Sequence, residues 1–212
     1  MQFPRLVLLN TLKKELRYEQ SILKPPVYLS EFIRKHNLLE QTSRNSQYIK
    51  VYKQVLAYTV QIEFPFRPPV PIRNKRKYED DHSDEEESDV DDPISSMFKQ
   101  DVSKFFLSIQ AGQDQFIHFE CFTYESAIWF QNIVCTEKLP EYVASLFRNT
   151  EVQVNYNILN ENLQQCLVDW VKALEISEEF GKFIELRSLF KEKELYLAWL
   201  ENVTRVIEDQ KE

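Results

Sequence analysis

Ten carboxylates crowd into the fourteen residues from Glu79 to Asp92, with the sequence EDDHSDEEESDVDD. Carboxylates at this density repel one another, and their field attracts cations over roughly 8 Å at physiological salt. The chemistry that this window predicts is therefore binding of cationic partners. Its ten acidic residues are Glu79, Asp80, Asp81, Asp84, Glu85, Glu86, Glu87, Asp89, Asp91 and Asp92.

The window also dominates the charge of the whole chain. The 212 residues carry 26 Lys and Arg against 34 Asp and Glu, a net charge of −8, so the remainder without the ten acids is +2. Five bases lie just before it, between Arg67 and Lys77. Because such a segment has almost no apolar residue to bury, we expect a long mobile insertion over about residues 67–98. A loop that only keeps the protein soluble is the alternative.

Other chemistries have less support in the sequence. Two glycines are too few for a phosphate-cradling loop, and the histidines have neither metal-ligand spacing nor an obvious nucleophile (Gly112, Gly181; His36, His82, His118). An odd number of widely spaced cysteines indicates a reducing compartment and buried thiols (Cys121, Cys135, Cys166). We therefore expect no enzyme activity, no metal and no cofactor. The sequence contains no run of 18 apolar residues, so we expect no transmembrane helix.

Two short features inside the insertion stay open. The basic run Arg73–Lys77 is a candidate nuclear address or nucleic-acid contact, although the neighbouring carboxylates would weaken phosphate binding. Ser83 and Ser88 are each followed by acids at the first and third positions, so they are either phosphorylation sites or ordinary loop serines.

The elements that would hold this insertion follow from periodicity. Apolar residues at helical spacing predict a helix over Val7–Leu23, ended by Pro25 and Pro26, and a helical turn over Leu29–His36. Alternation at a period of two then predicts strands over 48–53 and 58–64, the second half-buried with Thr59, Gln61 and Glu63 on its polar side.

Beyond the insertion, strands are predicted over 101–109, 116–122 and 128–134, with one or two more over 142–154. Gly112 suits the hairpin loop between the first two because glycine tolerates a positive φ. Connections this short cannot contain crossover helices, so the sheet should be antiparallel.

Two helices are predicted to close the chain, over 160–174 and 178–208, the second capped by Ser177. The apolar stripe of the long helix is too wide for a single partner. We expect one side to pack on its own domain and another to meet something else.

These residues resemble the C-terminal signature of the mitochondrial glycoprotein family, the mitochondrial acidic matrix or complement C1q-binding proteins. The matching positions are Phe180, Lys193, Glu194, Tyr196, Trp199, Leu200, Val203 and Ile207. An N-terminal helix, a strand ending at Val60–Phe64, an acidic insertion and a strand ending at Phe119–Cys121 follow in the family's order. One departure is Glu175, where relatives usually have glycine between the last two helices.

The resemblance implies an α+β fold in one domain over residues 1–212. A strongly twisted antiparallel sheet of about seven strands would be flanked by one N-terminal and two C-terminal helices, and three subunits would close into a ring. The residues expected to pack helices or subunits together are Leu9, Leu12, Leu16, Phe180, Phe183, Tyr196, Trp199, Leu200, Val203 and Ile207.

The function implied is that of a non-enzymatic acidic binding or chaperone-like protein of the mitochondrial matrix. It would support mitochondrial ribosome assembly, translation or oxidative phosphorylation by binding cationic proteins, such as ribosomal proteins, or RNA–protein complexes, with RNA reached indirectly. No mitochondrial presequence is visible in the sequence. The alternative is a nuclear or cytosolic acidic chaperone for histone-like basic proteins.

Overall fold

The computed structural model describes residues 2–42, 46–66, 102–112, 115–149 and 153–209. Its helices are α1 (Gln2–Ile22), α2 (Val27–Lys35), α4 (Leu146–Asn149), α5 (Glu161–Ala173) and α6 (Glu178–Asp209), with 3-10 turns η1 (Val143–Ser145) and η2 (Tyr156–Ile158). Its strands are β1 (Leu39–Gln41), β2 (Tyr48–Val55), β3 (Tyr58–Pro65), β4 (Ser103–Ala111), β5 (Phe116–Tyr124), β6 (Ala127–Thr136) and β7 (Val154–Asn155). The predicted insertion over 67–98 lies outside the described residues.

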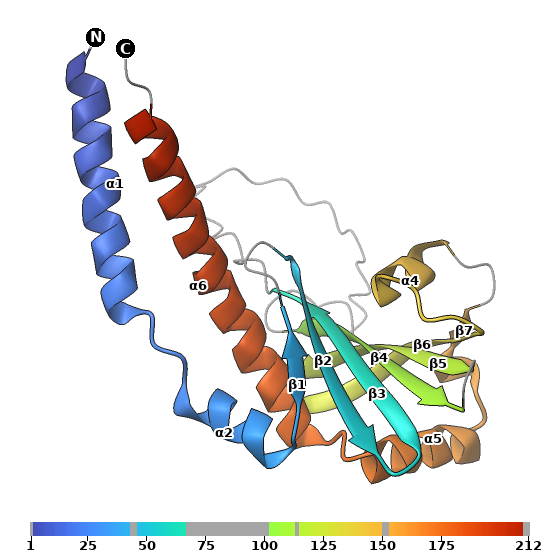
Figure 1. The fold of residues 1–212 in the computed structure, drawn as a ribbon. Helices are drawn as coiled ribbons and strands as arrows, with labels where there is room; N and C mark the ends of the chain where they lie inside the picture. The colour runs from blue at the N-terminus through green and yellow to red at the C-terminus, as the bar shows by residue number, and fades with distance from the viewer. Residues whose placement is uncertain (1, 43–45, 67–101, 113–114, 150–152, 210–212) are drawn as a thin grey trace, which may run out of the picture.

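The seven strands form one antiparallel sheet in the order of the chain, which confirms the α+β class (Figure 1). The central strands are paired over long stretches, with Ile62 opposite Val51 on β2 and opposite Leu107 on β4. β1 was not predicted, because three residues are too few to establish a period of two.

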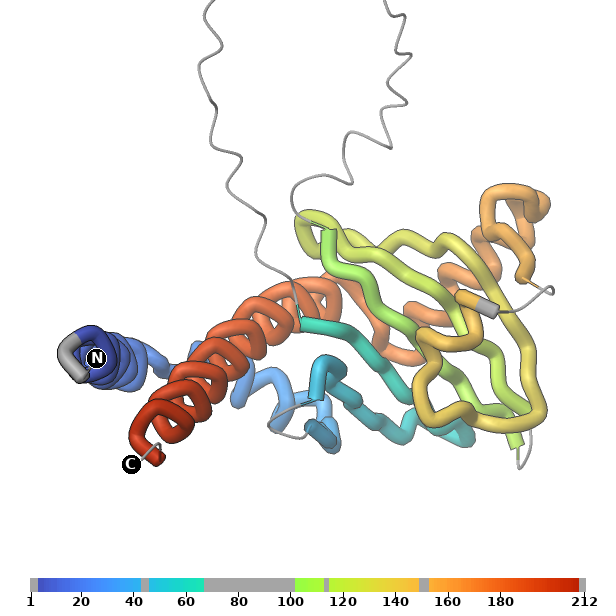
Figure 2. The backbone as a smooth tube through the Cα atoms, turned by 90° about the horizontal axis from the view of Figure 1, so that it is seen from above, coloured from blue at the N-terminus to red at the C-terminus, as the bar shows by residue number. Residues whose placement is uncertain are grey.

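Helices α2, α5 and α6 cover one face of the sheet, which we call the helix face (Figures 1 and 2). The N-terminal half of α6 provides most of its contacts. The Phe183 ring stacks on Phe32 of α2 at 4.7 Å and meets Phe64 of β3 edge-on at 6.4 Å. Phe180 and Ile184 are also fully buried in this core.

Helix α1 does not lie on the sheet but runs beside the C-terminal half of α6, and the two helices project beyond the strands (Figure 1). The Arg5 guanidinium donates to the carbonyl of Ile207 at 2.7 Å, and Lys13 pairs with Glu208 at 2.5 Å. The long helix therefore meets two partners in one chain, the sheet with one half and α1 with the other.

The opposite side of the sheet, the outer face, corrects two predictions. β3 is not half-buried, because Gln61 and Glu63 are buried as well. The segment over 142–154, which was expected to form one or two strands, instead forms η1 and α4. Only its end, where β7 begins, is a strand. The η1 segment crosses the outer face because the Glu63 carboxylate accepts hydrogen bonds from the backbone N–H groups of Val143 and Ala144, both at 3.3 Å.

The cysteine prediction holds for only one thiol. Cys121 is buried in the helix-face core, where burial raises its pKa well above the ordinary value. Cys135 on β6 and Cys166 on α5 are free and exposed, so the expectation of buried thiols was wrong for both. The reason is that no other element of the described ranges covers either side chain.

Glu175 fills the left-handed position that ends α5, with φ +63°. The Ile176 N–H bonds to the Val171 carbonyl and the Glu175 N–H to the Lys172 carbonyl, the arrangement usually completed by glycine. The Glu175 carboxylate pairs with the buried Lys53 ammonium, which lowers the Glu175 pKa.

Gly181 lies at a close approach between α6 and the sheet. A Cβ built there would be 2.2 Å from the carbonyl oxygen of Ser126, in the turn between β5 and β6. A glycine in a helix interior ordinarily lowers stability. The close approach instead excludes any larger residue.

His118 and its neighbours fill the middle of the outer face. Thr136 donates its hydroxyl to the Lys138 carbonyl at 2.8 Å, so its oxygen accepts from His118 Nε2 at 2.8 Å, and His118 Nδ1 accepts from the Ser108 hydroxyl at 2.7 Å. This fixes the neutral tautomer, and burial lowers the His118 pKa to about 4. A nucleophile thus lies beside the histidine, contrary to the prediction.

Replacing Gly181 with alanine should lower the free energy of unfolding by about 3 kcal/mol, because the new methyl group collides with rigid backbone. Alanine would otherwise favour a helix by about 1 kcal/mol, so the sign itself is informative. Urea unfolding measures the effect. Gly112→Ala is the matched control: with φ +78° and open space around it, this change should cost only about 1 kcal/mol. Equal losses for the two variants would contradict the close packing of α6.

The His118 network should make stability depend on pH. The unfolded histidine takes up a proton near 6.5 and the folded one only near 4, so the contribution is complete above pH 6.5 and is lost as pH falls towards 4. The expected loss is roughly 3 kcal/mol. Unfolding free energies of the native chain and His118→Gln, measured from pH 7 to 4, should converge as pH falls. A constant difference would refute the buried neutral state.

Candidate functional site

All ten predicted acidic residues, from Glu79 to Asp92, lie outside the described residues. What is described is their attachment. β3 ends at Pro65 and β4 begins at Ser103, and the two strands are central neighbours whose pairing continues to Glu63 opposite Phe106. The ends of the strands lie side by side (Figure 2). The segment that carries the acids is therefore attached to two neighbouring paired strands inside the sheet.

The predicted packing residues fall into three groups. Leu12, Phe180, Phe183 and Leu200 are buried, whereas Leu9, Leu16, Val203 and Ile207 are partly buried. Tyr196 and Trp199 are exposed, at 40% and 55%, and their rings stack at 6.0 Å. With Leu189 and Val206 they form an exposed row at helical spacing, the α6 stripe (Leu189, Tyr196, Trp199, Val206). Within one chain the stripe faces solvent.

A charged cluster joins α6 to the edge of the sheet. The Arg187 guanidinium donates to both oxygens of Glu40 on β1, at 2.8 to 3.2 Å, and lies 3.5 Å from Glu194. Lys191 is almost fully buried beside them, and burial lowers its pKa. This cluster holds the short edge strand in place, and periodicity could not have revealed it.

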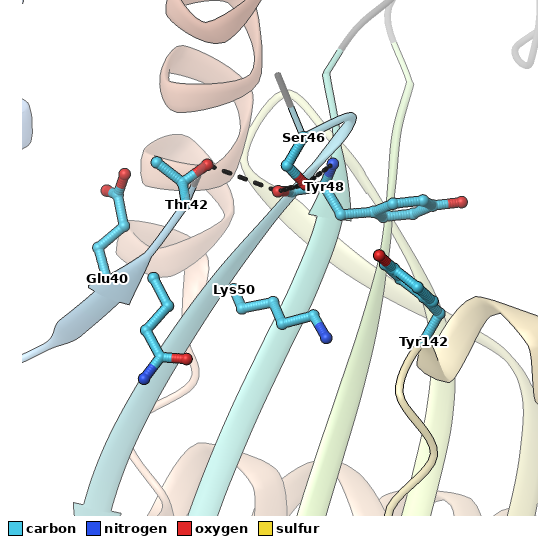
Figure 3. Close-up of a pocket in the computed structure, with 7 residues that line it drawn as sticks. Glu40, Thr42, Ser46, Tyr48, Lys50 and Tyr142 are labelled. Carbon is cyan, nitrogen blue, oxygen red and sulfur yellow. Dashed lines mark hydrogen bonds between the residues drawn. The ribbon is translucent and has the colours of Figure 1, made fainter. Parts of the chain in front are cut away.

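An open groove of about 490 Å³ lies between β1, β2 and the start of η1, as Figure 3 shows. Lys50 Nζ lies 4.7 Å from the centre of the Tyr142 ring and 3.7 Å from Glu63, and donates to the Glu141 carbonyl. Burial raises the Glu63 pKa, while the backbone N–H groups of η1 and Lys50 oppose that rise. The groove's lysine is thus already fully engaged within the chain.

A second groove, of about 330 Å³, lies where β3 ends and β4 begins. Its wall combines aromatic rings with two cations, and its residues are Tyr48, Pro65, Phe66, Lys104, Phe106, Glu120, Ala144, Phe147 and Arg148. The Phe106 and Phe147 rings stack at 5.5 Å, which holds α4 over the strand. The sequence analysis missed this groove because it forms only when α4 folds back across β4.

The Ser108–His118 pair is the arrangement closest to an active site, but it is sealed. Ser108 is 2% exposed, His118 is fully buried, and the cavity beside Ser108 is about 40 Å³, too small for a substrate. Within the described ranges, no cluster of three His, Cys, Asp or Glu side chains has the geometry to hold a metal ion. Nor does any helix of the described part have the length and apolar character needed to cross a membrane.

Two solved structures share this fold over almost their entire length. One is a Leishmania major protein described as a sequence homologue of human p32, with 13% identity, a TM-score of 0.64 and coverage of 96% of this chain and 99% of that one. The other is the Trypanosoma brucei p22 protein, with 12% identity, a TM-score of 0.65 and coverage of 96% and 98%. At this identity they establish the fold alone.

No curated protein matches the sequence. The mitochondrial glycoprotein (MAM33) family model, in contrast, matches residues 12–207, from α1 to the last turns of α6. That range includes both faces of the sheet, the connection between β3 and β4, and the long helix whose sequence pattern first indicated the resemblance. The chain therefore belongs to the mitochondrial glycoprotein family.

Proposed function

We propose that this protein is a non-enzymatic acidic binding protein of the mitochondrial matrix that holds cationic proteins through residues 79–92. The observation that carries the proposal is the place of the acidic window in the chain. Ten carboxylates are attached between two central paired strands, so their charge stays with a rigid body instead of trailing at a terminus. Cationic clients would include ribosomal proteins, and RNA would be reached through such proteins.

The electrostatic field of the acidic residues would attract the client, which would not need to fit a pocket of fixed shape. A high local density of carboxylates accelerates encounter with basic surfaces and accepts many arrangements of lysine and arginine. This fits a chaperone-like role in mitochondrial ribosome assembly, translation or oxidative phosphorylation, where several basic proteins need to be bound transiently. Family membership supports the mitochondrial address.

Three copies would strengthen the effect. Tyr196 and Trp199 in the α6 stripe are exposed within one chain, and an exposed apolar row of this kind marks an association surface. We therefore propose a homotrimer in which a second chain covers the stripe. Three windows on one ring would then give avidity for clients with several basic segments.

A nuclear or cytosolic chaperone for histone-like proteins is the second candidate, and the basic run Arg73–Lys77 favours it. Both candidates use the same acidic window, so binding data alone do not separate them. Imaging of the full-length gene product in cells does: mitochondrial signal supports the first, and nuclear signal that is lost when the run is neutralised supports the second.

The acidic window should determine client affinity. Replacing its ten acids with Asn and Gln keeps length and polarity, and should weaken binding of a 20-residue Lys/Arg-rich peptide at least tenfold at low salt. At about 1 M salt, where the screening length is roughly 3 Å, the native chain and this variant should bind alike. Fluorescence anisotropy across a salt series measures both. Equal affinities and equal salt slopes would leave the window as a solubilising loop.

Native mass should report the trimer. Three chains of 25.4 kDa give about 76 kDa, and Trp199→Ser should shift the mass towards one chain because it removes the largest ring of the stripe. Val27→Ser is the matched control, since Val27 is 69% exposed on α2, away from the stripe. Native mass spectrometry and light scattering give the result. A native chain that stays monomeric at micromolar concentration would contradict both the ring and the avidity.

A further inference from the structure

Helix α1 has a second side, which points away from α6. The side that faces α6 carries Leu12, which is buried, and Arg5 and Lys13, which bind the last turn of α6. Because successive residues of a helix are rotated by about 100°, the opposite side carries a different set of residues. We call this set the α1 outer face, and its members are Leu6, Val7, Lys14, Arg17, Tyr18 and Ile22.

The α1 outer face is largely apolar and open. Four of its six side chains are aliphatic or aromatic and about half exposed, from 49% for Val7 to 59% for Tyr18. They lie outside the helix-face core, because α1 runs beside α6 and projects beyond the strands (Figure 1). The surface of a single helix is convex, so these side chains present a ridge and not a pocket.

The charges of α1 are sorted between its two sides. Glu15 and Glu19 lie towards Tyr196 of α6: the Tyr196 hydroxyl donates to Glu15 at 3.4 Å, and both carboxylates add to the rise that burial causes in the Tyr196 pKa. Lys14 and Arg17 are exposed on the outer face, and within the described ranges no carboxylate pairs with either. The α1 outer face is therefore cationic, although the chain as a whole is acidic.

Half-exposed apolar side chains interleaved with bases on one side of a helix fit an anionic lipid surface. Such a helix lies in the plane of the interface, with its apolar side chains between the lipids and its bases at the level of the phosphates. Attraction of the bases to anionic headgroups adds to the apolar insertion. A cationic client, in contrast, would be repelled by Lys14 and Arg17, and a nucleic acid would leave the aliphatic side chains without a partner.

We propose that the α1 outer face binds the surface of an anionic phospholipid bilayer. Its apolar side chains insert between the lipids, whereas Lys14, Arg17 and the exposed Lys24 just beyond the helix lie against the phosphates. The acidic window is attached to the sheet, on which α1 does not lie, so the proposal does not rest on the proposed function. Binding is reversible, because one amphipathic helix face is a weak anchor.

The test is co-sedimentation of the full-length chain with vesicles of phosphatidylcholine that contain about 30% phosphatidylglycerol, at 50 mM salt. Pure phosphatidylcholine vesicles should bind at least tenfold more weakly. Replacing Lys14 and Arg17 with Gln should weaken binding to the anionic vesicles about tenfold and flatten its salt dependence. The matched control replaces Arg34 on α2 and Lys172 on α5, two exposed bases elsewhere, and should change binding less than twofold.

The apolar part of the face has its own test. Tyr18→Ser with Ile22→Ser should weaken vesicle binding about tenfold, whereas Tyr18→Phe should keep it within about twofold because the ring remains. Thermal melting confirms that the variants fold, since both side chains are exposed and the core is untouched.

Three results would overturn the proposal: no binding to anionic vesicles at 50 mM salt, equal binding to neutral vesicles, or unchanged binding in the Lys14 and Arg17 variant. A shift of native mass towards one chain in either outer-face variant would assign the face to a second copy instead. Neutralising residues 79–92 separates this proposal from the function above. That variant should lose the cationic peptide and bind anionic vesicles at least as tightly as the native chain.

Discussion

The seating of α6 on the helix face is the contact on which the other parts depend. Phe183 is fully buried between Phe32 and Phe64, and each such side chain contributes about 1.5 to 3 kcal/mol of hydrophobic stabilisation. Gly181 permits the necessary approach, because any side chain there would meet the turn between β5 and β6. Once seated, α6 positions α2 through Phe32 and β1 through Arg187, and its C-terminal half provides the only long surface on which the described part of α1 packs. The helix is thus a spine rather than one layer among several.

This arrangement leaves the two sides of the sheet with different tasks. The helix face is closed by apolar packing, whereas η1, held by Glu63, and α4 cover parts of the outer face, which carries polar as well as aromatic side chains. The Ser108 hydroxyl and the His118 imidazole are buried on the outer face, beside a cavity of about 40 Å³. Binding is proposed for the window attached between β3 and β4 and for the α6 stripe.

Sequence periodicity predicted the elements that have a regular apolar face. The alternation of Val60, Ile62 and Phe64 gave β3, and the long apolar repeat gave α6 almost to its last residue. Periodicity failed where the burial of a residue depends on a segment that is distant in the sequence. Glu63 read as solvent-facing because its partners, two backbone N–H groups about 80 residues away, have no signature in a strand pattern. Trp129 was not singled out from the sequence, because only the register shows that Phe122 and Lys104 lie beside it. The acidic window, in contrast, was legible from composition alone.

The central claim is that the scaffold makes the acidic window into a binding site. The direct measurement compares a synthetic peptide of residues 79–92 with the full-length chain, per window, for the same Lys/Arg-rich probe in isothermal titration at low salt. The account predicts that the peptide binds at least tenfold more weakly, because a free strand of carboxylates lacks both the rigid attachment and the neighbouring copies. Equal affinity per window would contradict it, since the fold would then add nothing to the charge.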